Sequence, residues 1–326
     1  MALADPAPLE VHDQLSPVQN GRTTGRIAAP TAMSIDVEDW FHVENLRGVV
    51  SRESWNRREL RVERMMDRML ELLDQHDAKA TCFVLGWVAE RAPGLVQRLA
   101  AAGHEVASHG YHHELVHELT EGEFAADVRR SKDVLERITG ERVLGYRAPS
   151  FSLTDWAIPL LEEAGFDYDS SFFPTTVTRG RYGKPATLQG SDGLRLGNGG
   201  LAEVPLSCLQ IRGQALPWAG GGSFRLLPYR LFKSGVEKIV DSGKPYIFYI
   251  HPWELDSGQP RVAGLGRSQR IRHYLNLEKT ESRWTALLSD FRWTTIADLL
   301  RTAGAKRPVQ GGMSESQEDR SRQAGS

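Results

Sequence analysis

Short apolar runs alternate with amphipathic stretches through most of the chain. Runs rich in apolar and β-branched residues predict strands at 32–35, 80–85, 104–107, 143–146, 202–205 and 246–250. Apolar residues at helical spacing predict helices at 61–75, 95–102, 121–138, 154–165, 229–240, 281–289 and 296–301. Thr120 is a suitable N-cap for the helix 121–138, and Gly140 a suitable end. This alternation favours an α/β architecture with parallel strands.

The two ends of the chain differ from this central part. Residues 1–28 are polar and contain proline, and residues 305–326 have no aromatic side chain. Segments of this composition bury too little apolar surface to offset the entropy lost on folding. We therefore expect a disordered segment 1–28, a single folded domain 29–304 and a disordered tail 305–326.

Composition and charge narrow the classes of function. Of the 326 residues, 40% are hydrophobic and 25% charged, as in an ordinary globular protein. The formal net charge of -2, without a basic stripe, argues against a nucleic-acid partner.

Residues 1–28 lack the apolar stretch of a signal peptide, and no run reaches the roughly 20 apolar residues of a membrane span, so a cytoplasmic location is expected. Cys82 and Cys208 lie in apolar runs and are predicted to be free thiols.

Chemically versatile side chains follow the predicted strands, where (β/α) barrels build their active sites. Asp36, Glu38 and Asp39 end the first strand, and His109 follows the third strand, four residues before His113. Two histidines spaced in this way share one face of a helical turn and can bind one cation. Two histidines and a carboxylate with an open position form a catalytic metal site, which suits zinc. A second carboxylate is then free to act as general base.

Two further strand ends carry Arg147 and His251. An arginine is permanently charged and can hold a carboxylate such as Asp36 in its ionised form. His251 ends the most apolar strand, and an imidazole is a suitable general acid for a departing amine. Each residue alone also has an ordinary structural explanation, such as a surface acid, a solvated histidine-rich turn or a core histidine. The functional interpretation therefore depends on their combination.

Together and in this order, these segments resemble the motifs of the polysaccharide deacetylase family, carbohydrate esterase family 4. The segments are Ser34–Asp39, His109–His113, Arg147–Pro149 and Tyr249–His251. The run 79–86 is also typical of the family, and the resemblance covers about residues 31–300. It implies a distorted (β/α) barrel with about seven parallel strands.

The resemblance implies a single divalent metal, with zinc as first choice and cobalt, nickel or manganese as compatible ions. His109 and His113 are the expected ligands, together with one carboxylate. The family usually has two adjacent aspartates where two residues separate Asp36 from Asp39 here. Either Glu38 or Asp39 is therefore the third ligand, and strand alternation favours Glu38, on the same side as Asp36.

The resemblance also implies the catalytic roles. Asp36 is the expected base, His251 the acid and Arg147 the partner of the base. The backbone N–H of Ser150, where the family often has tyrosine, is the expected oxyanion donor, and Trp253 is expected to contact the substrate. The family's usual acidic partner of the acid histidine has no evident counterpart, and Asp169 is a trial assignment.

Three segments, 36–42, 220–229 and 272–277, are similar to deacetylases encoded with exosortase and exopolysaccharide gene clusters. This similarity implies an exopolysaccharide, or its lipid-linked precursor at the inner membrane face, as substrate. It also marks about 256–304 as a C-terminal extension packed on the catalytic domain. No oligomeric state is predicted.

The function expected from the sequence is metal-dependent hydrolysis of N-acetyl groups from amino sugars. One alternative is an allantoinase-like amidohydrolase that acts on a small non-sugar amide. Another is a catalytically silent carbohydrate-binding protein that has kept the fold.

Overall fold

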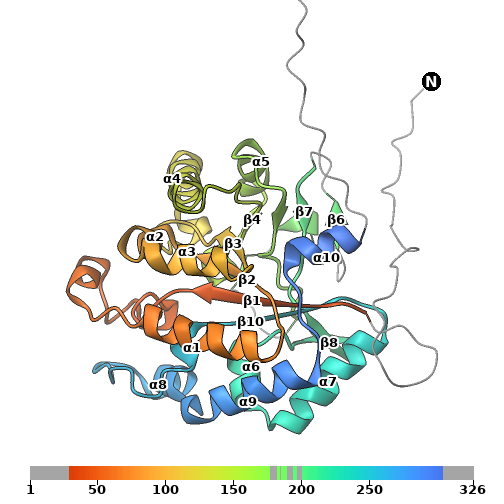
Figure 1. Cartoon of the computed structure of the whole chain (residues 1–326). Helices are drawn as coiled ribbons and strands as arrows, with labels where there is room; N and C mark the ends of the chain where they lie inside the picture. Colours follow the sequence, from red (N-terminus) through yellow and green to blue (C-terminus); the bar gives the residue numbers. More distant parts are fainter. Residues whose placement is uncertain (1–28, 177–181, 184, 189–193, 197–199, 304–326) are drawn as a thin grey trace, which may run out of the picture.

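The computed structural model describes residues 29–176, 182–183, 185–188, 194–196 and 200–303, which form a curved sheet wrapped by helices (Figure 1). The sheet has the strand order β10-β1-β2-β3-β4-β5-β7-β6. Its parallel strands are β1 (Thr31–Val37), β2 (Ala80–Val84), β3 (Glu105–Ser108), β4 (Gly145–Tyr146), β5 (Tyr168–Asp169), β7 (Ala202–Glu203) and β10 (Tyr246–Ile250). The short β6 (Arg195–Leu196) is antiparallel to β7. A separate hairpin consists of β8 (Cys208–Ile211) and β9 (Gln214–Pro217).

Helices follow most of the strands, as the alternation predicts. They are α1 (Val62–Gln75), α2 (Gly86–Arg91), α3 (Pro93–Ala101), α4 (Glu121–Thr139), α5 (Ala157–Glu163), α6 (Gly221–Leu226), α7 (Tyr229–Asp241), α8 (Arg267–Tyr274), α9 (Leu277–Asp290) and α10 (Ile296–Thr302). Each predicted strand and helix has a counterpart among them. Thr120 caps α4 in a capping box with Glu123, and Gly140 ends it at a φ of 70°, as predicted. The sequence interpretation missed β5, β6, β9, α2, α6 and α8, and it identified β8 only as an apolar run around Cys208.

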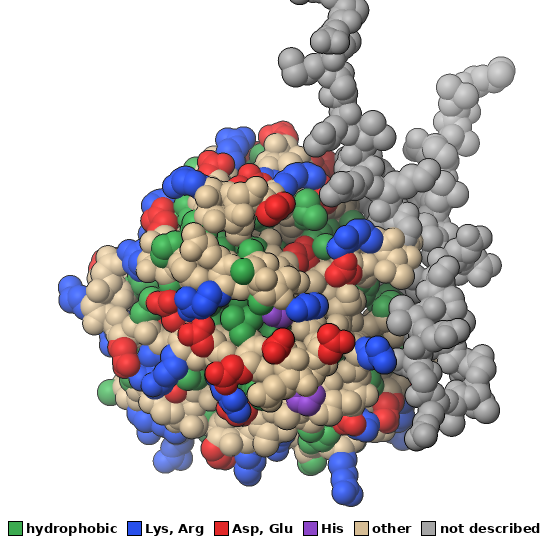
Figure 2. Space-filling model, viewed as in Figure 1, with side chains coloured by type: hydrophobic (Ala, Val, Ile, Leu, Met, Phe, Trp, Pro, Cys, Tyr) green, Lys and Arg blue, Asp and Glu red, His purple; other side chains and the backbone are tan. Residues whose placement is uncertain are grey.

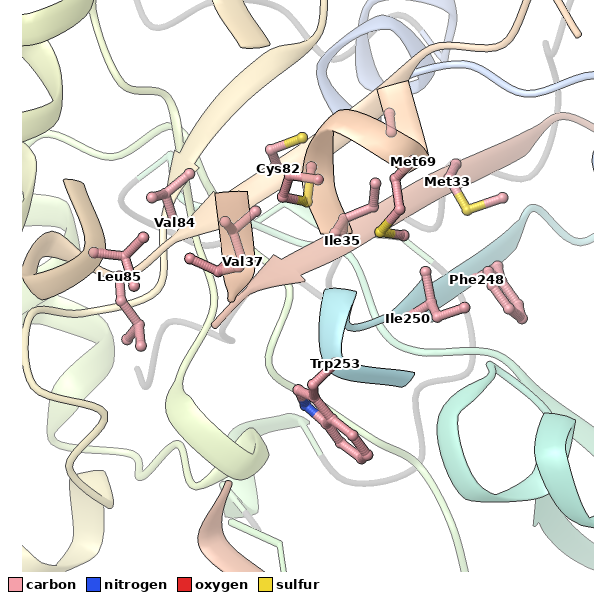
Figure 3. Packing of buried hydrophobic residues seen from close by; sticks show 14 of the residues in the cluster. Met33, Ile35, Val37, Met69, Cys82, Val84, Leu85, Phe248, Ile250 and Trp253 are labelled. Carbon is pink, nitrogen blue, oxygen red and sulfur yellow. The ribbon is translucent and has the colours of Figure 1, made fainter. Parts of the chain in front are cut away.

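Side chains on successive strand residues separate into two cores. The inner cluster, inside the barrel, combines small and large residues: Ala32, Phe83, Ala107, Tyr168, Ala202, Ile247 and Tyr249. The outer cluster lies between sheet and helices, and Figure 3 shows part of it: Met33, Ile35 and Val37 of β1, Cys82 and Val84 of β2, Phe248 and Ile250 of β10, and Met69 of α1. This alternation is the expected result of a two-residue side-chain period in strands that are buried on both faces. It also aims Ser34 and Asp36 into the barrel.

One end of the barrel is closed by α10. Its apolar residues Ile296, Leu299 and Leu300 belong to the inner cluster. Two N–H groups of its first turn donate to barrel side chains, from Ile296 to Thr81 Oγ1 at 2.8 Å and from Ala297 to Glu105 Oε2 at 3.0 Å. In Figure 1 the β1 arrow points away from α10. The carboxyl ends of the strands are therefore at the other end, which is left for the site.

The barrel wall is irregular between β7 and β10. Here the chain from 204 to 219 bonds to β10 without forming a regular strand of the sheet. Ile247 N donates to Ser207 Oγ at 2.8 Å, and Tyr249 N donates to Ala219 O at 2.7 Å. The predicted fold class, a distorted (β/α) barrel with about seven parallel strands in a single domain, is confirmed.

Several other expectations have simple outcomes. Neither Cys82, which is buried, nor Cys208, which is partly exposed, forms a disulfide within the described residues. Within the described ranges, no helix is long and apolar enough to cross a membrane. Charged side chains of both signs are interspersed over the face shown in Figure 2. The predicted disorder of 1–28 and 305–326 lies outside the described residues, and the domain boundaries remain predictions.

Candidate active site and metal centre

Three buried side chains meet at the open end of the barrel. Glu38 directly follows β1, while His109 and His113 follow β3. One ligand atom of each lies within 4.8 Å of those of the other two. His113 Nε2 is 3.0 Å from Glu38 Oε2. The structure thus brings together the two histidines and one of the two carboxylates expected as ligands.

The two histidines converge by a route that differs from the predicted helical turn. β3 ends at Ser108, and residues 109–113 form no helix. Gly110 and His113 instead have positive φ of 71° and 56°. The turn is fixed by Asp127 of α4, whose Oδ2 accepts from Tyr111 N at 2.7 Å. The prediction of a helical face was wrong because left-handed residues fold the segment back on itself, and strain of this kind is frequent at functional sites.

The donor set fits a divalent metal. His109 Nδ1 donates to the Arg147 carbonyl at 2.8 Å, which leaves Nε2 free as a ligand. Burial lowers the pKa of His109 to about 4, so the ring is in the neutral form that metal binding requires. Glu38 Oε2 is buried and faces His113 Nε2 at 3.0 Å, and no other group within the described part of the chain donates a hydrogen bond to it. Burial raises the pKa of Glu38, but the nearby imidazoles, His113 first, more than reverse this and leave the carboxylate ionised. One carboxylate and two imidazoles suit zinc or a neighbouring ion.

Asp39, the other carboxylate considered, has a different role. Its Oδ2 accepts from the backbone N–H groups of Arg61 and Val62 at 2.5 and 2.8 Å, at the start of α1. Its Oδ1 accepts from Trp40 N at 2.8 Å. Asp39 therefore satisfies N–H groups that a helix start leaves unpaired. Glu38 is the carboxylate beside the histidines.

Asp36 lies next to this cluster and is held by Arg147. Arg147 Nη1 donates to Asp36 Oδ1 at 2.7 Å and to Ser34 Oγ at 2.8 Å. Its Nε and Nη2 donate to the carbonyl and hydroxyl of Ser170, each at 2.9 Å. The guanidinium is fully buried and lies 4.1 Å from the centre of the Phe83 ring. One oxygen of Asp36 is thus occupied by a fixed cation, and Oδ2 remains for chemistry.

His251 lies beside the same cluster, close to Asp36 and Glu38. Its Nε2 lies 3.8 Å from Asp36 Oδ2 and 3.4 Å from Glu38 Oε1. Its side chain is 17% exposed, against 2 to 5% for Asp36, Glu38 and His113, so the cluster opens to solvent beside His251. Burial lowers the pKa of His251, but the hydrogen bond to Glu254 and the nearby carboxylates outweigh it and raise the pKa to about 9. This imidazole is placed and charged to donate a proton.

The partner of His251 is Glu254, which corrects the trial assignment of Asp169. Glu254 Oε1 lies 2.7 Å from His251 Nδ1. Asp169 accepts instead from the hydroxyl and N–H of Ser171, at 2.6 and 2.9 Å, and its pKa is raised by burial beside Glu203. The sequence does contain a signal for Glu254. It lies three residues after His251, and Pro252 opens a short 3₁₀ turn (Pro252–Glu254) that returns the carboxylate to the ring.

Ser150 and Trp253, predicted as the oxyanion donor and a substrate contact, lie in different surroundings. Ser150 lies on the turn after Arg147 and adopts a left-handed φ of 51°, followed by Phe151 at 57°. Trp253 is buried, and its ring stacks on His251 and on His273 with centroid separations of 5.2 and 4.7 Å. Its Nε1 donates to Glu38 Oε1 at 3.2 Å. Trp253 therefore supports the site instead of presenting an exposed face to a sugar.

Comparisons with known proteins match two segments of the chain to known families. Residues 59–168 match the family described as polysaccharide deacetylase, and residues 170–301 match a domain of unknown function, DUF3473. A peptidoglycan-N-acetylglucosamine deacetylase of Bacillus cereus is 27% identical over 38% of this chain and 53% of its own length. A peptidoglycan deacetylase of Helicobacter pylori is 31% identical over 34% of this chain and 38% of its own. The chain thus spans about half or less of these relatives.

A solved structure from Mycobacterium smegmatis, whose name places it among the polysaccharide deacetylases, covers this chain more fully. The match includes 91% of this chain and 100% of that one, with a TM-score of 0.55 and 23% sequence identity. At this level of identity the likeness establishes a common fold. It extends over both segments that the family comparisons matched separately.

Proposed function

We propose that this chain, a member of the polysaccharide deacetylase family by its 59–168 segment, hydrolyses the N-acetyl group of amino sugars. One observation carries the proposal. His251 Nε2 lies 3.8 Å from Asp36 Oδ2 and 3.4 Å from Glu38 Oε1, so an acid and a base flank a three-ligand metal site. Amide hydrolysis needs these groups together, because water must lose a proton and the amine must gain one.

In this mechanism each side chain has one task. A divalent ion held by Glu38, His109 and His113 supplies a Lewis acid for the amide carbonyl and for water when bound. Asp36 takes a proton from the attacking water through Oδ2, since Oδ1 is engaged by Arg147. The attack forms the new C–O bond of acetate.

The second half of the reaction breaks the C–N bond. His251, partly exposed at the mouth, gives its Nε2 proton to the departing nitrogen. The Ser150 N–H is assigned to the oxyanion that develops in between. The products are the free amino sugar and acetic acid, which loses its proton to solvent and becomes acetate. Asp36 passes its proton to His251, directly or through solvent, so both groups return to their starting states.

The substrate class that we propose is an exopolysaccharide or its lipid-linked precursor. Its support is the sequence similarity of the segments 36–42, 220–229 and 272–277 to deacetylases of exopolysaccharide gene clusters. The relatives from Bacillus cereus and Helicobacter pylori are named for peptidoglycan, which also contains N-acetylated amino sugars. Amino-sugar deacetylation is the chemistry common to both groups.

The test is acetate release from N-acetylated oligosaccharides, lipid-linked amino sugars and a small non-sugar amide, with and without a chelator. We expect release from at least one sugar, loss of release with chelator, and a loss of more than about 100-fold in Asp36→Asn, since removal of a positioned general base costs about 10²–10⁴-fold. Release from the non-sugar amide alone would indicate an allantoinase-like enzyme. Absence of both release and bound metal would indicate a silent binding protein.

A further inference from the structure

A row of buried side chains leads from α6 to His251. Glu254 Oε1 accepts from His251 Nδ1 at 2.7 Å, and Glu254 Oε2 accepts from Arg225 Nε at 2.6 Å. The Glu254 side chain is fully buried and that of Arg225 is 4% exposed. A buried carboxylate bonded through both oxygens has a fixed orientation. It therefore fixes the imidazole with Nδ1 toward Glu254 and Nε2 toward Asp36 and Glu38.

Arg225 is in turn held by carbonyls at the C-terminal end of α8. Its Nη1 donates to the carbonyls of His273 and Leu275 at 2.9 and 3.0 Å, and its Nη2 to that of Arg272 at 2.9 Å. The last carbonyls of a helix have no partner within it, so the guanidinium satisfies groups that would otherwise be unpaired. Asn276 Nδ2 closes the connection by donating to the Arg225 carbonyl at 2.7 Å. The α8 end is thus linked to Glu254 through one residue.

Trp253 fixes the plane of the same imidazole. Its ring stacks on His251 at an interplanar angle of 29° and on His273 at 12°. His273 is itself held by Gln259, with Nε2 and Oε1 2.7 Å apart. The Nε1 bond from Trp253 to Glu38 Oε1 joins this stack to the metal site. The hydrogen bond from Glu254 therefore fixes the direction in which the His251 nitrogens point, and the stack on Trp253 fixes the plane of the ring.

We infer that Glu254 and Arg225 are positioning residues for the acid His251. We also infer that the segment 170–301, whose family match is a domain of unknown function, is the half of the active site that supplies and orients this acid. This inference depends on the proposed deacetylation. His251, Trp253, Glu254, Arg225 and the carbonyls of α8 all lie in this segment. Asp36, Glu38 and the metal-binding histidines all lie outside it.

The test is Glu254→Gln, which keeps the shape of the side chain but removes its charge. Loss of a partner that orients an active-site histidine lowers activity by about 10–100-fold. We expect that loss in kcat, with KM for the sugar and zinc per chain within about twofold of the wild type. Arg225→Lys keeps a charge but cannot replace all four donors, so kcat should fall in the same direction.

A second readout does not require activity. In chelated protein with ¹⁵N-labelled histidine, the His251 Nδ1 proton that donates to a carboxylate should give a protected, downfield NMR signal. We expect this signal in the wild type and its loss in Glu254→Gln. If no sugar releases acetate, the proposed function fails, whereas the signal still reports whether Glu254 orients His251.

Glu105→Gln is the matched control. Glu105 is a half-buried carboxylate at the α10 end of the barrel, where it accepts from Thr81 Oγ1 at 2.6 Å and from the Tyr168 hydroxyl at 2.8 Å. Its amide variant should lower stability and leave kcat unchanged. Wild-type kcat in an active Glu254→Gln preparation, or equal losses of kcat in Glu254→Gln and Glu105→Gln, would overturn the inference.

Discussion

Asp36, Glu38 and Asp39 are close in sequence yet occupy three different environments. Asp36 points into the barrel toward Arg147, Glu38 meets the two histidines, and Asp39 satisfies the start of α1. Strand alternation in the sequence already favoured Glu38 over Asp39 as the ligand. The role of Asp39 was not predictable, because its N–H partners at Arg61 and Val62 are far away in sequence.

The pair Glu38→Gln and Asp39→Asn separates these roles. Glu38→Gln should weaken zinc binding by more than about 100-fold, because even the loss of an outer-shell partner costs about 10–100-fold. Asp39→Asn should retain zinc but lower the free energy of unfolding by about 1–3 kcal/mol, since a buried N–H loses its acceptor. Competition with a chromogenic chelator and urea unfolding measure the two effects. Zinc loss in Asp39→Asn alone would reverse the assignment.

The carboxylate that bonds to His251 could not be identified from the sequence. Asp169 has the right chemistry but bonds to Ser171, while Glu254 reaches His251 because of the 3₁₀ turn that Pro252 opens. A side chain three residues away is close in space in a helical or 3₁₀ turn but not in an extended segment. The sequence shows the spacing but not the backbone angles.

The segment after β3 differs most from the structure that the sequence predicted. The spacing of His109 and His113 predicted a shared helical face, whereas positive φ at Gly110 and His113 brings the rings together. The longer helices and strands were predictable because each repeats its pattern of apolar residues several times. The short helices α2 and α6 were not, since six residues each give less than two turns of periodicity.

Gly110→Ala tests this loop, with Gly140→Ala as its control. Both glycines have φ near 70°, where a side chain costs roughly 1–2 kcal/mol. A Cβ on Gly110 would lie 3.0 Å from Asp127 Oδ2, whereas one on Gly140 would meet nothing within 4 Å. We expect similar or greater destabilisation in Gly110→Ala, with weaker zinc binding in that variant only. Calorimetric zinc titration is the measurement, and unchanged zinc affinity in Gly110→Ala would contradict the account.

At the scale of the molecule, the two segments matched by family comparison belong to one barrel. β10, from the 170–301 segment, pairs with β1, which pairs on its other side with β2. α10 from the same segment closes the inner core. The class of fold was predictable from alternating elements. The wall at 204–219 was not, because its bonds to β10, to the Ser207 side chain and the Ala219 carbonyl, do not form a regular strand ladder that an apolar pattern could indicate.

A fragment of residues 29–169 should therefore not fold on its own. It lacks β10, β7 and α10, so one edge of β1 is exposed and most residues of the inner cluster are missing. We expect no cooperative urea transition by circular dichroism for this fragment, against a cooperative one for the full chain. A sharp transition in the fragment would show that the 170–301 segment is a separate domain.

Acetate release should require one divalent ion bound by Glu38, His109 and His113. The most direct measurement is to remove metal with a chelator, add zinc back in steps and follow acetate release from the best sugar substrate. We predict activity that rises linearly and reaches its plateau at one zinc per chain, with no recovery in Glu38→Gln at the same zinc concentrations. Full activity in metal-free protein, or equal recovery in Glu38→Gln, would contradict the account.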